Sequence, residues 1–146
     1  MTYCVASNHF HVLVEVTQRA GPMPDEAQLL ANDLVTRFPN EKGVWAQRGY
    51  LMFMLQDYAL AQSDLKAALQ FGKWNADQVR NLRVALAESA LAADEPKGAL
   101  AALEPLGGAR YFAVQYALAR AYLGAEDREK ATQAAKTAKT LATNGE

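Results

Sequence analysis

A register of small and apolar residues recurs along most of this chain. Within residues 45–72 it fixes the spacing of Trp45, Gly49, Ala61, Leu65 and Ala68. The second half of the pattern also stands upstream, where Ala27 precedes Ala61 by 34 residues (61 − 27). An internal period of about this size predicts stacked helix pairs, because one pair cannot bury its apolar face without a neighbour.

The register continues toward the C-terminus with a changing period. Ala99 and Leu103 take the places of Ala61 and Leu65, and Ala131 follows in the next unit. The spacings are 38 residues (99 − 61) and then 32 residues (131 − 99). We interpret this drift as insertions and deletions of a few residues between repeats.

Local patterns predict seven helices and the turns between them. Apolar residues recur at three- and four-residue steps, as a buried helical face requires. The predicted ranges are 25–37, 42–55, 58–71, 75–93, 96–106, 110–124 and 127–142. Asp57 and Asp127 are expected in short turns between paired helices. Gly49, Ala61 and Ala68 are expected where paired helices approach closely, since larger side chains would overpack the contact.

Composition excludes several classes of protein. Fifteen basic and sixteen acidic residues give a net charge of −1, which removes the simplest argument for a nucleic-acid-binding surface. The lone cysteine, Cys4, excludes an internal disulfide and a zinc site made of cysteines alone. No apolar run approaches the ~20 residues that a membrane helix needs. The N-terminus lacks a basic region and a long apolar region, so we expect no signal peptide and a cytoplasmic location by default.

Residues 24–142 resemble the tetratricopeptide repeat family. The densest match is the pattern W…G…DY..A…L..A, which begins at Trp45 and ends at Ala68. The resemblance implies an all-α, right-handed helix-turn-helix solenoid of about three helix pairs plus one leading helix. It also implies a non-enzymatic scaffold that binds a protein or peptide in a concave groove, with no cofactor, no nucleic acid and no membrane insertion. On this interpretation residues 23–146 are the repeat domain and residues 1–22 a short non-helical arm.

The resemblance also assigns candidate groove residues, because the first helix of each pair lines the groove in this family. These residues are Gln47, Tyr50, Asn81, Val84, Glu88, Tyr116 and Arg120. The alternative is that they are ordinary exposed helix residues. Ala46 and Ala85 occupy two places of the Lys/Asn set with which some family members clamp a C-terminal carboxylate. A chaperone-tail adaptor is therefore disfavoured.

The two tryptophans have different expected roles. Trp45 stands at a repeat position, which favours packing within the repeat over contact with a partner. Trp74 lies just outside the register, after Gly72. It is predicted either to be an exposed contact for a partner or to cover a helix end.

The N-terminal residues 1–16 resemble a different family, the REP-associated single-tyrosine transposases. In the stretch SNHFHVLVEV, His9 and His11 match a His-hydrophobic-His motif whose side chains share one strand face and hold a divalent metal. Residues 12–17 are accordingly expected to form a strand. The preceding strands of those enzymes have no counterpart here, and the other tyrosines lie in repeat-like segments. Two histidines also fall short of the three or four ligands of a stable site, so we interpret this segment as an inactive transposase-like remnant.

Three functions remain open from the sequence. The favoured one is the protein-binding scaffold, since no Gly-rich phosphate loop or supported Ser/His/Asp order is present. The second is a DNA-nicking protein that uses His9 and His11 with a metal. The third follows from a likeness of residues 81–131 to repeats of bacterial envelope proteins for polysaccharide export or phage adsorption, which would imply a periplasmic location.

Overall fold

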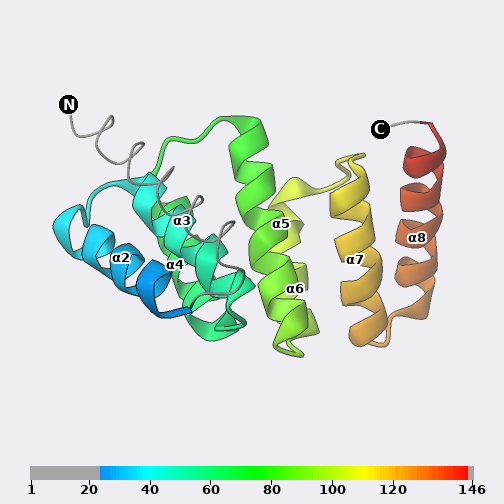
Figure 1. Ribbon diagram of the computed structural model, residues 1–146. Helices are drawn as coiled ribbons and strands as arrows, with labels where there is room; N and C mark the ends of the chain where they lie inside the picture. Colours follow the sequence, from blue (N-terminus) through cyan, green and yellow to red (C-terminus); the bar gives the residue numbers. More distant parts are fainter. Residues whose placement is uncertain (1–23, 145–146) are drawn as a thin grey trace. The chain divides into compact units, whose positions relative to one another are not determined.

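Helices make up nearly all of the regular structure of this chain. The computed structural model describes residues 24–144, and no strand occurs within that range. The helices are α2 (Pro24–Arg37), α3 (Lys42–Met54), α4 (Tyr58–Phe71), α5 (Ala76–Ala92), α6 (Pro96–Leu103), the 3₁₀ helix η1 (Glu104–Leu106), α7 (Phe112–Gly124) and α8 (Arg128–Thr143) (Figure 1). The predicted all-α class, with one leading helix and three helix pairs, is confirmed. The expected strand at 12–17 and the arm 1–22 lie outside the described residues.

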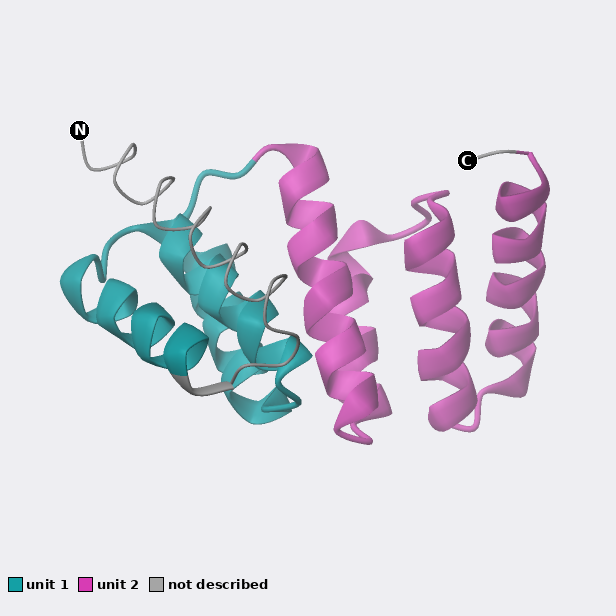
Figure 2. Cartoon of the chain, in the orientation of Figure 1, with its two compact units in different colours: residues 1–74 teal, residues 75–146 magenta. Residues whose placement is uncertain are grey.

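The chain divides into two compact units, residues 1–74 and 75–146 (Figure 2). In the first unit, α2 packs on α3, and α3 pairs with α4. In the second unit, α5 pairs with α6 and α7 pairs with α8, while α6 and α5 both contact α7. Each unit therefore has its own set of packed helices, and each is described by itself below.

The turn inside each helix pair has the same construction. Gln56, Asp94 and Glu126 all have left-handed backbone conformations, with φ values of 64°, 60° and 63°. The next residue donates its N–H five residues back in each case, as in the bond from Asp57 to the Met52 carbonyl at 2.9 Å. This is the Schellman pattern that satisfies the last carbonyls of a helix. The side chains of Asp57 and Asp127 then cap the following helices, α4 and α8, as expected for turn residues.

Small residues bring the paired helices of the first unit together, as predicted. A Cβ added at Gly49 would lie 2.8 Å from Leu65 Cγ, so α3 and α4 touch backbone to side chain there. Ala61 and Ala68 on α4 are fully buried. The core around them combines five buried residues, which are Ala27, Ala31, Leu51, Met52 and Ala61.

The helix boundaries of the second unit differ from prediction at two places. The predicted helix 96–106 ends at Leu103 and tightens into η1, because Pro105 has no N–H to continue the α-helical ladder. The predicted start at residue 110 is also wrong, since α7 begins at Phe112. Tyr111 is extended at the N-cap, and the side-chain amide of Gln115 donates to the Ala109 carbonyl at 2.9 Å, which stabilises this late start.

The period drift has its source within a helix. Residues 56, 94 and 126 mark equivalent turns, spaced by 38 (94 − 56) and 32 (126 − 94) residues. Helix α5 has 17 residues, whereas α3 and α7 have 13 each. The four additional residues are one extra turn of α5, so the insertion lies inside a helix and not between repeats.

Candidate functional site

Three of the predicted groove residues form a connected group in the second unit. Arg120 on α7 donates from Nη1 to Glu88 Oε2 on α5 at 2.5 Å. The same guanidinium lies over the Tyr116 ring, with 5.6 Å from Cζ to the ring centroid. Tyr116 is 49% exposed, so one aromatic surface remains open to solvent. The structure thus brings Glu88, Tyr116 and Arg120 together, as an α5–α7 face requires.

The other predicted residues are less tightly grouped. On α5, Asn81 is exposed and Val84 is half-buried, and neither forms a hydrogen bond or ion pair that would fix a site. On α3 of the first unit, Tyr50 is 37% exposed, and partial burial raises the pKa of its hydroxyl. Gln47 is half-buried, and its buried Oε1 accepts no hydrogen bond within residues 24–144. Whether these residues line a groove remains a prediction.

Phe112 belongs to the same face but was not predicted. Its ring stacks on Tyr116 with 5.7 Å between centroids and 13° between planes. Phe112, Tyr116 and Arg120 are spaced by four residues along α7, and residues at this spacing are neighbours on one face of a helix. That spacing was the signal available in the sequence. We call these three residues the α7 stripe.

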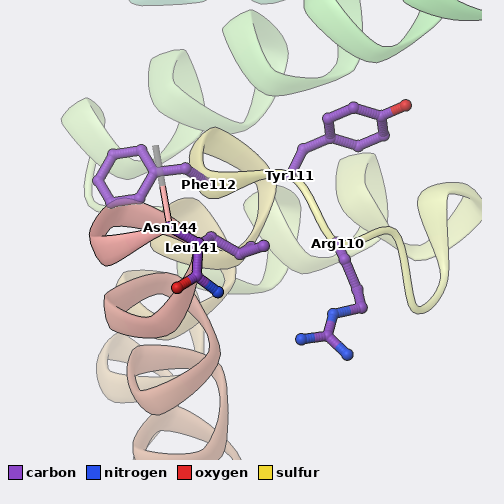
Figure 3. Close-up of a pocket in the computed structure, with 5 residues that line it drawn as sticks. All are labelled: Arg110, Tyr111, Phe112, Leu141 and Asn144. Atoms are coloured by element: carbon purple, nitrogen blue, oxygen red, sulfur yellow. The ribbon is translucent and has the colours of Figure 1, made fainter. Parts of the chain in front are cut away.

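An open hollow of about 720 Å³ lies at the N-terminal end of the α7 stripe. The described residues that line it are Arg110, Tyr111 and Phe112 before and at the start of α7, with Leu141 and Asn144 at the end of α8 (Figure 3). Tyr111 is held in place by Arg80 of α5, whose guanidinium lies 3.9 Å from the ring centroid. Arg80 is itself positioned by Asp77, with 2.7 Å between Nη1 and Oδ1.

Both tryptophans have structural roles in the first unit. Trp45 is half-buried, stacks on Phe71 at 6.0 Å and donates from Nε1 to the Pro39 carbonyl at 2.8 Å. The packing role predicted for Trp45 is therefore confirmed. Trp74 donates from Nε1 to the Ala68 carbonyl at 2.7 Å and lies under the Lys42 ammonium. Of the two roles predicted for Trp74, the structure supports a cap over the end of α4.

Metal chemistry finds no support in the described part of the chain. Between residues 24 and 144, no three His, Cys, Asp or Glu side chains cluster closely enough to hold an ion. His9 and His11 lie outside these residues, so the transposase-like interpretation stays a hypothesis. No helix in the described range combines the length and the apolar character needed to cross a membrane.

Comparison with known proteins identifies the fold. No protein-family model and no curated protein matches this sequence. Among solved structures, a mutant of MamA, a protein with tetratricopeptide repeats, matches with a TM-score of 0.74. The match covers 93% of this chain and 77% of that chain at 20% sequence identity. At this identity the likeness shows the fold alone, and it confirms that the chain has a tetratricopeptide-like helical repeat fold.

Proposed function

We propose that this chain is a non-enzymatic scaffold that binds a peptide or a segment of a partner protein. Repeat folds of stacked helix pairs present extended surfaces, so binding energy is spread over several side chains. The second unit offers such a surface along the α7 stripe, with Glu88 of α5 beside it. Tyr50 on α3 is the corresponding candidate in the first unit.

The observation that carries this proposal is the exposed Phe112–Tyr116–Arg120 stripe. Tyrosine and arginine are enriched among the residues that dominate binding energy at protein interfaces. Arg120 is held by Glu88 on one side and Tyr116 on the other, which restricts its rotamers before a partner arrives. A side chain ordered in advance loses less conformational entropy on binding, and this favours affinity.

A capture experiment tests the proposal. The purified chain is immobilised, partners are isolated from extract, and their affinities are measured for wild type and for Tyr50→Ala, Tyr116→Ala and Arg120→Ala. We expect the α7 variants to weaken binding at least tenfold, the effect of about 1.4 kcal/mol, since residues of this type cost more than 1 kcal/mol when truncated at interfaces. Circular dichroism confirms that each variant stays folded.

Arg128→Ala provides a matched control. Arg128 is also an exposed arginine of the second unit, but it lies in the first turn of α8 and outside the stripe. Its removal changes the net charge as Arg120→Ala does and should leave affinity unchanged. Equal capture of every identified partner by wild type and all three test variants would refute the binding face.

A further inference from the structure

The hollow beside the α7 stripe combines one unpaired cation with apolar walls. Arg110 is exposed, and its guanidinium forms no ion pair, hydrogen bond or ring contact with the described residues. None of the described residues that line the hollow is acidic. The side-chain amide of Asn144 adds a second hydrogen-bond donor at its edge. The polar part of the hollow is therefore suited to an anionic group.

The apolar part of the hollow comes from both helices of the last pair. Phe112 is 40% exposed, and Leu141 contributes a side chain that is otherwise buried in the core. In the view of Figure 3, Leu141 and Asn144 lie between Phe112 on one side and Arg110 on the other. A volume of about 720 Å³ is within the range of about 300–1,000 Å³ typical of ligand sites, and it has room for two side chains.

From this arrangement we infer that the hollow binds an acidic side chain of a peptide together with an adjacent aromatic or large aliphatic side chain. A carboxylate accepts hydrogen bonds from the Arg110 guanidinium, whose planar donors match its two oxygens. The neighbouring apolar side chain packs on Phe112 and Leu141. This inference rests on the proposed function and specifies its partner class, because Phe112 belongs to both the hollow and the α7 stripe.

A peptide fits these observations better than a nucleic acid. Single strands bind to proteins through tracks of positive charge that follow several phosphates. Here the stripe that continues from the hollow contains one arginine, and that arginine is already paired with Glu88. The chain as a whole has a net charge of −1. One carboxylate beside an apolar group meets the single free guanidinium without placing further negative charge near Glu88.

A peptide-display selection with the full chain tests the inference. A random twelve-residue library is selected on wild type, on Arg110→Gln and on the matched control Arg128→Gln, which removes an exposed arginine outside the hollow. We expect wild type and Arg128→Gln to enrich peptides in which Asp or Glu adjoins an aromatic or large aliphatic residue. Arg110→Gln should lose the enrichment of acidic residues.

Fluorescence polarisation then measures the most enriched peptide and its counterpart with the carboxylate replaced by the amide. On wild type the amide peptide should bind about tenfold more weakly, as expected for loss of a charged hydrogen bond. On Arg110→Gln the two peptides should bind equally. Amide shifts of residues 110–112 and 141–144 in nuclear magnetic resonance spectra should accompany binding.

The outcomes separate this inference from the proposed function. If wild type and Arg110→Gln enrich the same peptides while Tyr116→Ala weakens their binding, the hollow is not the subsite but the binding face stands. If wild type enriches no peptide, both ideas are wrong. Competition by a twelve-nucleotide oligothymidylate that depends on Arg110 would overturn the assignment to a peptide.

Discussion

The ion pair between Arg48 and Asp64 should dominate the stability of the first unit. Arg48 on α3 donates from Nε and Nη2 to the two carboxylate oxygens of Asp64 on α4, at 2.6 and 2.8 Å. Its Nη1 donates to Asn32 Oδ1 on α2 at 3.1 Å, so one guanidinium joins all three helices. The Asp64 side chain is 1% exposed and the Arg48 side chain 14% exposed. Water therefore cannot replace either partner.

Replacing Asp64 with Leu leaves the guanidinium largely buried without its counter-charge. Breaking a buried pair in this way costs about 3–5 kcal/mol, a large part of the 5–15 kcal/mol that stabilises a typical domain. The double variant Arg48→Met/Asp64→Leu removes both charges and substitutes apolar side chains. Because buried pairs repay little more than their desolvation, the double variant should be clearly more stable than Asp64→Leu alone.

The two tryptophans provide the assay. Both tryptophans of the chain, Trp45 and Trp74, lie in the first unit, so their fluorescence during urea unfolding follows that unit. Far-UV circular dichroism follows the helices of both units. Arg48 lies 5.4 Å from the Trp45 ring centroid, so its replacement also alters fluorescence intensity. The midpoint and slope of the transition, and not its amplitude, give the free energy of unfolding.

Two results would refute this reasoning. If Asp64→Leu lowers the free energy of unfolding by less than 1 kcal/mol, the pair is more hydrated than its geometry indicates. If the double variant loses as much as the sum of the single variants, the two residues are not energetically coupled. Either result would move the main stabilisation of this unit to its apolar contacts.

Three further predictions concern small changes in the fold. Gly49→Ala should lower the free energy of unfolding by about 1–3 kcal/mol, because the added Cβ would lie 2.8 Å from a side-chain carbon of α4. Gly43→Ala on the same helix, where a Cβ meets nothing within 4 Å, should raise it by about 0.5–1 kcal/mol, and equal stabilities of the two variants in urea titrations would contradict the packing argument. Gln56→Gly should raise the stability by about 0.5–1 kcal/mol in thermal melts because it relieves a left-handed conformation, and an unchanged melting temperature would count against strain. Hydrogen bonds from the backbone and side chain of Lys130 lower the pKa of Asp127, so this cap stabilises the fold above the unfolded pKa of about 3.9 and its contribution is lost as the pH falls through the lower folded pKa. A carboxyl titration by nuclear magnetic resonance should show this, and a Lys130→Ala variant that leaves the pKa unmoved would contradict it.

Sequence reasoning succeeded where the fold depends on spacing alone. The helix pairs follow from apolar periodicity, and the contact at Gly49 follows from its fixed offset to Ala61. The left-handed turns were not predictable in the same way, because Gln56, Asp94 and Glu126 are not glycines and give no local signal. Their conformation is imposed by helices that must reverse over two residues and pack together. Tertiary packing here overrides local preference.

The candidate site was predictable only in part, for a related reason. Glu88, Tyr116 and Arg120 are named by repeat register, and the structure joins them through an ion pair and a ring contact. Gln47 has the same register, yet it is half-buried. The hollow was missed because it depends on where α7 begins. A helix that began at residue 110 would have carried Arg110 and Tyr111 on its first turn instead of in the connection before it.

The extra turn of α5 links the irregular period to the site. Aligned on the equivalent turns at residues 56, 94 and 126, the four additional residues of α5 are its first turn, residues 76–79. Asp77 of this turn positions Arg80, and Arg80 covers the ring of Tyr111 at the mouth of the hollow. A regular repeat, with α5 starting near residue 80, would have neither Asp77 nor the capping box of Asn75 and Gln78 to hold that arginine. The residue spacing that departs most from the family pattern thus supports the surface that we assign to partner recognition.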